Sequence, residues 1–166
     1  STTFDSGPNA VQAAASETID VYVAGVTPLA IGRGRGVDLR VVAASAIGEN
    51  VLVAGPKLAK LFEKDAPATE AFKRFSEEAG RPAKIATQPV GSIPYTNLMY
   101  WLREVKKVDP AHYQLVPLGI DAAQQAILAG VVDASTVREP GLTIIQERNP
   151  GIRLIVLKSR YRSIMR

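Results

Sequence analysis

The stretch that decides the fold reads Asp121-Ala122-Ala123-Gln124-Gln125-Ala126-Ile127, then Val132-Asp133-Ala134, Arg138-Glu139-Pro140 and Gly151-Ile152-Arg153-Leu154-Ile155-Val156. An earlier stretch has the same layout: Gly7-Pro8-Asn9-Ala10-Val11-Gln12-Ala13-Ala14, then Ile19-Asp20-Val21, Val26-Thr27-Pro28 and Gly36-Val37-Asp38-Leu39-Arg40-Val41-Val42. Each copy reads as a helix, a strand that begins at Asp, a loop, a helix with proline at its start, a glycine and a strand. Two similar halves predict two α/β lobes with a cleft between them. The alternative is that the match reflects only generic α/β patterning.

The rest of the chain continues this alternation. Strands are expected near residues 2–5, 19–24, 38–43, 50–54, 83–87, 114–118, 132–137 and 152–157, and helices near 8–16, 28–35, 57–64, 67–79, 94–107, 121–129 and 140–148. Alternating strands and helices predict mostly parallel sheets flanked by helices on both faces. We therefore expect a first, incomplete lobe over residues 1–50, a crossing segment with amphipathic helices over 51–82, and a second lobe over 83–166. The small residues within 44–55 predict the hinge there.

Composition limits the class of protein. The chain has 166 residues, of which 46% are hydrophobic and 22% charged, and it contains no cysteine. A disulfide framework, a thiol nucleophile and a thiolate metal site are thereby excluded. The net charge of +4 is spread along the chain except for Lys158, Arg160, Arg162 and Arg166 near its end. That segment is a solvated terminus or a weak site for acidic surfaces. The apolar runs are too short to span a bilayer.

Several junctions between a strand and a helix carry glycine, proline and hydroxyl residues. In open α/β sheets, ligands bind beyond the carboxyl ends of strands, against helix N-termini, where backbone N–H groups favour anions. The candidate ligand-binding residues at these junctions are Gly7, Pro8, Gly25, Val26 and Thr27 on one side and Gln88, Gly91, Ser92, Asp121, Arg138 and Glu139 on the other. For any one junction, the alternative is that proline, serine and threonine merely begin a helix.

Arg138 is the most specific of these candidates. It follows the expected strand 132–137, so it emerges at the carboxyl end, where its planar fork could hold a sulfonate, nitrate or carboxylate. The alternative is a salt bridge to Glu139 or Glu147. The carboxylate of Glu139 suits a ligand that also carries an amine or hydroxyl. Thr27 and Ser92 would add hydroxyl groups.

The same residues resemble a known family. An ordered set of motifs along the chain resembles the periplasmic substrate-binding proteins of nitrate, sulfonate and taurine ABC importers. The motifs in the first half are Ile19-Asp20-Val21, Gly25-Val26-Thr27-Pro28 and Gly36-Val37-Asp38-Leu39-Arg40-Val41-Val42-Ala43-Ala44. Those in the second half are Lys84-Ile85-Ala86-Thr87, Gly91-Ser92, Ala126-Ile127-Leu128-Ala129-Gly130-Val131-Val132-Asp133-Ala134 and Glu139-Pro140. The resemblance implies a two-lobed, hinge-closing binder that delivers a small anion to an importer permease. It also implies a periplasmic or extracellular location, with a lipid anchor on a preceding segment.

The chain departs from that family in three places. The family's opening strand and helix have no counterpart here, and the chain stops where the family returns to its first lobe. At the entry to the second lobe, a leucine-lysine-glycine-lysine stretch is replaced by Glu78-Ala79-Gly80-Arg81-Pro82-Ala83. These departures predict a partial chain. A first lobe built from residues 1–45 alone would expose a sheet edge and apolar surface, so we expect self-association or cover from further chain.

An enzyme is not expected, and neither is a cofactor, a metal or a nucleic-acid partner. The single histidine, His112, lies in a turn before a strand. Asp20 and Asp133 open strands after helices, which favours turn roles over paired-carboxylate catalysis. The glycine-rich stretch Gly32-Arg33-Gly34-Arg35-Gly36 follows a helix, whereas a dinucleotide-binding loop follows a strand. We therefore interpret it as the end of a helix. RNA binding through Arg-Gly is the less favoured alternative.

Three other classes of protein share this fold or pattern. The thiamine-pyrimidine synthases of this fold depend on histidine and cysteine chemistry, which this chain almost lacks. The effector-sensing domain of a bacterial transcription regulator is the alternative function, and a helix-turn-helix ahead of the chain would favour it. A plain structural module without a ligand is the third.

Overall fold

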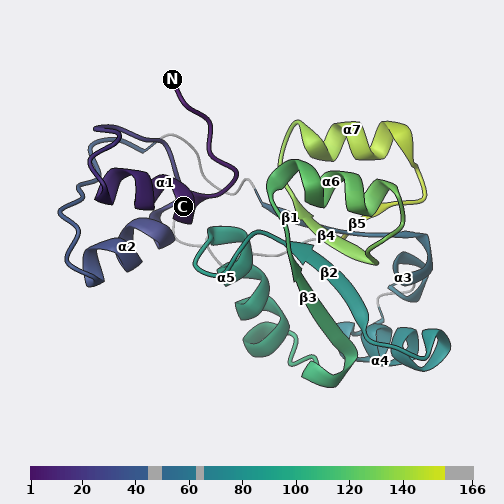
Figure 1. The fold of residues 1–166 in the computed structure, drawn as a ribbon. Helices are drawn as coiled ribbons and strands as arrows, with labels where there is room; N and C mark the ends of the chain where they lie inside the picture. The colour runs from purple at the N-terminus through teal and green to yellow at the C-terminus, as the bar shows by residue number, and fades with distance from the viewer. Residues whose placement is uncertain (45–49, 63–65, 156–166) are drawn as a thin grey trace, which may run out of the picture.

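The computed structural model describes residues 1–44, 50–62 and 66–155. Figure 1 shows two unequal parts, an N-terminal unit of two helices and a larger unit built around one sheet. The N-terminal unit holds α1 (Gly7–Ala15) and α2 (Val26–Gly34). The helices of the larger unit are α3 (Pro56–Leu61), α4 (Ala68–Ala79), α5 (Ile93–Tyr100), α6 (Ile120–Leu128) and α7 (Gly141–Arg148).

The sheet has five strands in the order β3-β2-β4-β1-β5. They are β1 (Val51–Ala54), β2 (Ala83–Thr87), β3 (Tyr113–Pro117), β4 (Ala134–Val137) and β5 (Arg153–Ile155). Strand β2 pairs in parallel with both β3 and β4. Strand β1 runs the opposite way, with Val51 opposite Val137 on β4 and Ala54 opposite Arg153 on β5. The sheet is therefore mixed, with β1 reversed between two strands that share a direction.

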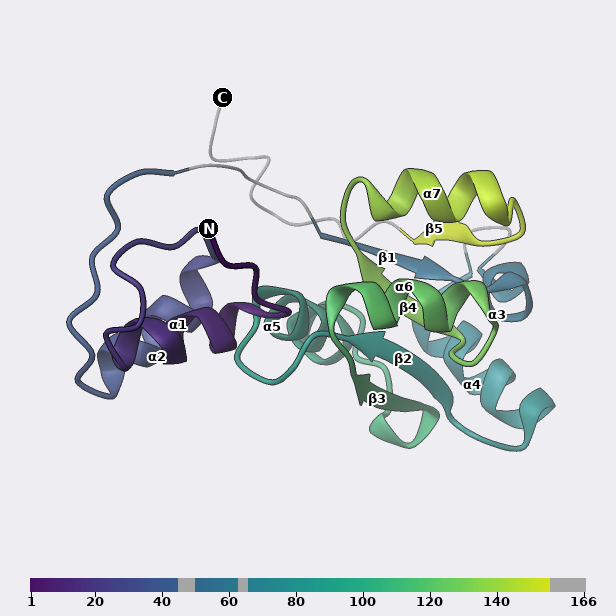
Figure 2. The same cartoon turned by 45° about the horizontal axis from the view of Figure 1, so that its top comes forward.

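Alternation along the strands places two separate cores on the two faces of the sheet. Leu52, Ala54 and Ile85 belong to a core with Phe72 of α4 and Leu98 of α5. The residues between them, Val53 and Ala86, belong to the opposite core with side chains of α6 and α7. Successive strand residues point to opposite faces, so these short apolar strands are covered on both sides. Figure 2 shows the resulting three layers, with α6 and α7 on one face and α3 and α4 on the other.

Local sequence accounts for most helix ends. The Ser92 hydroxyl accepts a hydrogen bond from the N–H of Tyr95 at 3.3 Å, with proline near the start of α5. Helix α4 ends at Gly80, whose φ of 64° is left-handed and suits glycine at a helix end. A π-helical turn, Trp101–Val105, continues α5, and a 3-10 turn, Pro110–His112, leads into β3.

The predicted helices are confirmed, and so are the predicted strands from residue 50 onward within the described residues. The strands predicted at 2–5, 19–24 and 38–43 are wrong: these segments are not paired with any strand among the described residues. A strand needs a neighbour to bond its backbone, and Figure 2 shows residues 35–44 as a single backbone trace with no strand beside it. Their apolar side chains are correspondingly exposed, by 79% at Val21 and 88% at Val42.

The prediction of two α/β lobes is therefore corrected: the described residues hold one sheet of five mixed strands, where two mostly parallel sheets were expected. The division at residues 50 and 82 stays a prediction, and β1 and α4 pack with the sheet unit. The central part of the predicted hinge, residues 45–49, lies outside the described residues, as does the basic segment at 158–166.

Candidate ligand-binding site

The carboxyl edge of the sheet gathers residues from four strands. Strands β2, β3 and β4 end there at Thr87, Pro117 and Val137, because they share a direction. Strand β1 runs the opposite way, so it begins at this edge, with Val51 beside Val137. Gln88, Ile120, Arg138 and Asn50 follow or precede these strand ends. Such an edge is the place where open α/β sheets bind ligands.

Two adjoining cavities open at this edge. The larger has a volume of about 770 Å³ and the smaller about 310 Å³. Asn50, Gln88, Ile120 and Arg138 line both, so the cavities meet at the strand ends. The larger cavity reaches from there to the N-terminal unit. The smaller lies over the start of α6 and the turn between β4 and α7, where Asp121 and Glu139 line it.

Four helices begin at the larger cavity. Its lining includes Ser6 and Gly7 at the start of α1, Gly25 before α2, Ser92 and Ile93 at α5, and Ile120 at α6. Helices α1 and α5 are capped by serine hydroxyls, whereas no side chain caps α2 or α6. Uncapped N-termini present backbone N–H groups and a partial positive charge, and both favour an anion.

Arg138 adds a full positive charge to this edge. It is exposed, follows β4 directly and makes no ion pair within the described residues. The alternative of a salt bridge to Glu139 or Glu147 is wrong for this structure. Glu139 is engaged elsewhere, since its carboxylate accepts hydrogen bonds from the N–H and the hydroxyl of Thr143 at 3.2 and 2.9 Å. The guanidinium is therefore available to a ligand in either cavity.

Two buried hydroxyl groups connect the ends of β2 and β4 next to the cavities. Thr87 at the end of β2 and Thr136 in β4 hydrogen-bond through their side chains at 3.0 Å, and both side chains are buried. Gln88 follows the first threonine immediately, and Arg138 follows the second after one residue. This pair ties the two strand ends together and so fixes the spacing of Gln88 and Arg138.

The structure collects seven of the eleven candidate residues around the two cavities. Gly7, Gly25, Gln88, Ser92 and Arg138 line the larger cavity, and Gln88, Asp121, Arg138 and Glu139 line the smaller. Pro8, Val26, Thr27 and Gly91 line neither. That the collected residues bind a ligand stays a prediction.

The glycines among the candidates also have a packing role. A Cβ on Gly25 would lie 2.1 Å from the Ile93 side chain, and one on Gly7 would lie 2.7 Å from Pro28. Gly91 has a φ of 88° and faces Ile31 of α2. Helix α2 thus docks against the start of α5 through backbone that carries no side chain, and this contact forms one wall of the larger cavity.

Sequence reasoning missed Asn50, Ile120 and the two threonines. The sequence predicts Asn50 only as the boundary of a crossing segment, because the reversal of β1 that brings it to the site leaves no local signal. Ile120 reads as an ordinary first residue of a helix. The threonines lie inside predicted strands, and only the pairing of β2 with β4 shows that they meet.

Other polar residues have structural roles. The Asp133 carboxylate accepts two bonds from Arg81, at 2.6 and 3.0 Å, and one from the Lys84 N–H at 2.8 Å. These partners lie about fifty residues away, so the role is structural and long-range, where a local capping or turn role was expected. Gly36, with a φ of 90°, follows the end of α2, as expected of a helix end. The described residues contain no group of three or more His, Cys, Asp or Glu that could hold a metal. None of their helices is long and apolar enough to cross a membrane.

Comparison with known proteins places the fold. The sequence profile of the NMT1-like family matches residues 1–154. The alkanesulfonate-binding protein SsuA from Xanthomonas axonopodis pv. citri, bound to MOPS, is 20% identical, with a TM-score of 0.69 over 93% of this chain and 48% of that one. A zinc-bound ligand-binding component of an ABC-type import system from Staphylococcus aureus is 16% identical, with a TM-score of 0.68 over 93% and 48%.

The periplasmic aliphatic sulphonate-binding protein SsuA from Escherichia coli is also similar, with 20% identity and a TM-score of 0.60 over 90% of this chain and 44% of that one. This chain therefore spans about half the length of the solved structures it matches. A search of curated proteins finds no match. The resemblance seen in the sequence motifs is confirmed, and the five-stranded sheet unit corresponds to one lobe of the periplasmic-binding-protein fold.

Proposed function

We propose that this chain, which belongs to the NMT1-like family, binds a small organic anion at the carboxyl edge of its sheet as the substrate-binding component of an ABC importer. The observation that carries the proposal is the convergence of four helix N-termini and the unpaired Arg138 on one cavity. Fixed partial charges and a guanidinium in one place favour an anion and need little rearrangement to hold it. The fold relatives that bind sulfonates or serve importers support the same class of function.

The roles of the lining residues follow from their positions. The guanidinium of Arg138 would take two oxygens of a sulfonate or carboxylate in parallel hydrogen bonds. Gln88 and Asn50 would add amide donors from the neighbouring strand ends, and the uncapped starts of α2 and α6 would add backbone N–H groups. Asp121 and Glu139, in the smaller cavity, would favour a ligand that also carries a donor. The importer permease as partner and a periplasmic location are parts of the same proposal.

The test is calorimetric titration of the 166-residue chain with sulfonates, carboxylates, nitrate and sulfate. Arg138→Ala should weaken binding of the anion that binds best by tenfold or more, because a charge-assisted hydrogen bond in a partly closed site contributes about 1.5–3 kcal/mol. Arg148→Ala is the matched control, since it removes the same charge from the exposed end of α7, away from the cavities. Equal affinity of wild type and Arg138→Ala would remove Arg138 from the site. If no anion binds, the proposed function is wrong.

The effector-sensing domain of a transcription regulator stays the alternative. Binding of the same anion would suit both, so the discriminating measurement is whether the ligand-loaded chain stimulates ATP hydrolysis by a reconstituted importer. Stimulation would support the importer component and count against the regulator.

A further inference from the structure

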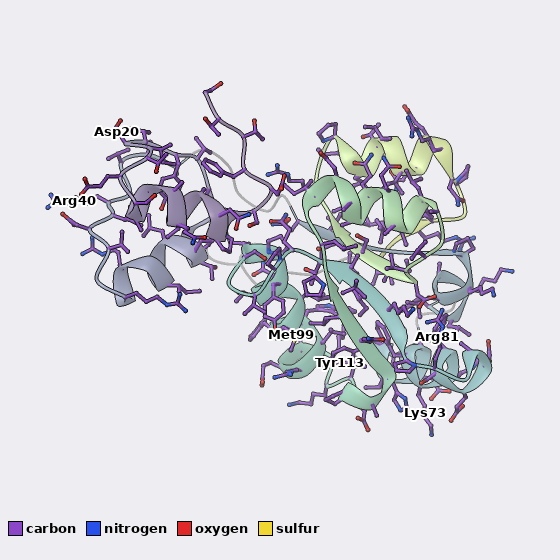
Figure 3. All side chains as sticks on the ribbon, in the orientation of Figure 1. Asp20, Arg40, Lys73, Arg81, Met99 and Tyr113 are labelled. Carbon is purple, nitrogen blue, oxygen red and sulfur yellow. The ribbon has the colours of Figure 1, made fainter. Side chains whose placement is uncertain are left out.

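One stretch of the N-terminal unit has the sequence of a strand but no strand to pair with. Val37-Asp38-Leu39-Arg40-Val41 alternates apolar and charged residues, which is the pattern of a half-buried strand. Figure 2 shows it within a single backbone trace that has no strand beside it. Figure 3 shows Arg40 at the outer edge of the N-terminal unit, on the side turned away from the sheet. The stretch is therefore open to a second molecule.

The backbone of this stretch has hydrogen-bond partners only at alternate residues. The N–H groups of Val37 and Leu39 donate to carbonyls of their own unit, at 3.1 and 3.0 Å, and the Leu39 carbonyl accepts a hydrogen bond from the Arg33 side chain. The N–H and carbonyl groups of Asp38 and Arg40 have no partner among the described residues. Successive residues of a strand direct these groups to opposite edges, so Asp38 and Arg40 leave one edge of the stretch unpaired.

The two charges of the stretch match those of a second copy of itself. When two such stretches run antiparallel about a two-fold axis at Leu39, residue 38 of each lies opposite residue 40 of the other. Asp38 of one copy then faces Arg40 of the second copy, and this contact occurs twice. An axis at Asp38 or at Arg40 would set like charges opposite each other, and so would parallel pairing in register. Both side chains are free to turn to a partner, being 78% and 81% exposed.

The apolar residues of the stretch favour the same register. Val37, Leu39 and Val41 share one face, and Leu39 packs toward α2, where a Cβ on Gly32 would lie 3.3 Å from it. Val41 is 63% exposed and would lie opposite the half-buried Val37 of the second copy. Opposed β-branched side chains stabilise antiparallel strands, so the pairing would also cover Val41.

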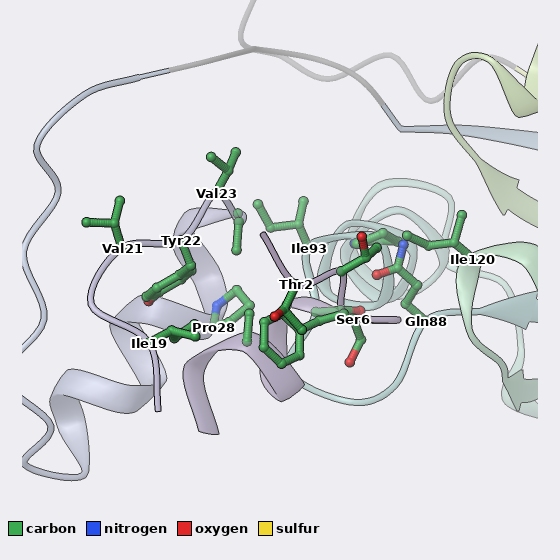
Figure 4. A pocket seen from close by; sticks show the side chains of 18 of the residues that line it. Thr2, Ser6, Ile19, Val21, Tyr22, Val23, Pro28, Gln88, Ile93 and Ile120 are labelled. Atoms are coloured by element: carbon green, nitrogen blue, oxygen red, sulfur yellow. The ribbon is translucent and has the colours of Figure 1, made fainter. Parts of the chain in front are cut away.

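A second unpaired stretch, residues 19–24, lacks this self-complementarity. Figure 4 shows Val21 and Val23 projecting to the same side, away from Tyr22, and both are exposed. Asp20 is the only charged residue of this stretch, so its charge cannot pair with an opposite charge in a second copy of the stretch. The charge pattern therefore assigns the contact to residues 37–41.

We propose that two copies of this chain associate through antiparallel pairing of residues 37–41 about a two-fold axis at Leu39, with Asp38 of each copy facing Arg40 of the other. This inference is independent of the proposed function, because residues 37–41 line neither cavity. A strand pair of five residues is a small interface, so the association is weak and depends on protein concentration.

Sedimentation velocity of the 166-residue chain tests the proposal from about 10 μM to 1 mM, a range that reveals a dissociation constant as weak as about 1 mM. The weight-average sedimentation coefficient should rise with concentration toward the value of a dimer. A monomer value throughout overturns the proposal, means that two copies do not cover the stretch, and leaves the proposed function standing.

Single charge reversals test the assigned surface. Arg40→Asp and Asp38→Arg should each lower the association constant about tenfold or more, because each sets two like-charge pairs across the axis. Arg35→Asp is the matched control, because it makes the same change of charge at an exposed residue outside the pairing, and it should change association by less than about twofold. If neither single reversal weakens association more than the control does, the surface is wrongly assigned. Circular dichroism checks that each variant is folded.

A mixture of the two single variants tests the register. Arg40→Asp has negative charges at both positions and Asp38→Arg has positive charges at both, so the two chains should associate with each other better than either does with itself. The double variant that carries both substitutions should self-associate as the wild type does. A mixture that associates no better than its separate components, or a double variant as weak as the single ones, overturns the two-fold pairing at Leu39.

Discussion

Replacement of Asp133 by alanine should destabilise the sheet unit well beyond what an ordinary surface substitution does. The Asp133 side chain is only 12% exposed and joins three partners: two nitrogens of Arg81 and the backbone N–H of Lys84. Arg81 in turn lies 5.6 Å from the centre of the Phe75 ring in α4. One carboxylate, directly before β4, thus connects that strand with the start of β2 and, through Arg81, with α4. The hydrogen bond to Asp133 also raises the pKa of Arg81, so the guanidinium keeps its positive charge.

The magnitude follows from the separate contacts. Losing the charge-assisted bond to the half-buried Lys84 N–H should cost about 1.5–3 kcal/mol. The Arg81 side chain is 43% exposed, so the ion pair adds no more than about 1 kcal/mol. Asp133→Ala should therefore lower the free energy of unfolding by about 2–4 kcal/mol. Asp133→Asn keeps one acceptor for the Lys84 N–H and should cost about 1 kcal/mol.

The assay is urea unfolding followed by circular dichroism and by the fluorescence of the buried Trp101. Glu77→Ala is the control, because it removes a carboxylate whose contact with Lys73 is 4.0 Å long and solvent-exposed, and it should change stability by less than about 0.5 kcal/mol. A double-mutant cycle with Arg81→Ala should show a coupling of about 1 kcal/mol. The reasoning fails if Asp133→Ala lies within about 0.5 kcal/mol of wild type.

Two further substitutions test the geometry of the site. Thr87→Val should lower the free energy of unfolding by about 1–3 kcal/mol, because it leaves the buried Thr136 hydroxyl without a partner. Adding Thr136→Val should recover part of that loss, as measured by urea unfolding. A double variant whose loss equals the sum of the two single losses would contradict the pairing. Gly25→Ala should loosen the N-terminal unit, because the new Cβ would meet Ile93 at 2.1 Å, and residues 1–44 should then exchange their amide hydrogens faster. Gly34→Ala, at the other end of α2, is the matched control, because a Cβ there meets no atom within 4 Å. Equal rates of amide exchange in the two variants would show that the Gly25–Ile93 contact does not hold the N-terminal unit in place.

The candidate site shows how far local sequence could reach. Gln88, Ser92 and Arg138 could be predicted as candidates because each follows a strand or begins a helix. Apolar runs, serine caps and the positions of proline indicate those boundaries in the local sequence. Asn50 could not be found in this way, because its place depends on the direction of β1. That direction is set by pairing with β4 and β5, which are separated from it by about eighty to a hundred residues. Ile93 likewise could not be predicted as a lining residue of the larger cavity, because it lies there only through the packing of Gly25, before α2, against the start of α5.

The repeated pattern that opens the sequence gives the sharpest contrast. Both copies formed their helices as expected, because capping residues and helical periodicity act within a few residues of chain. The later copy also formed strands, whereas the earlier segments at 19–24 and 38–43 stayed unpaired with Val21 and Val42 exposed. A helix bonds its own backbone, so sequence alone determined the helices and the residues that begin them. A strand makes its backbone hydrogen bonds to a neighbouring strand, which can be distant in the sequence. Only the tertiary structure therefore decided which apolar runs formed the sheet, which way β1 runs and which side chains meet at the carboxyl edge of the sheet.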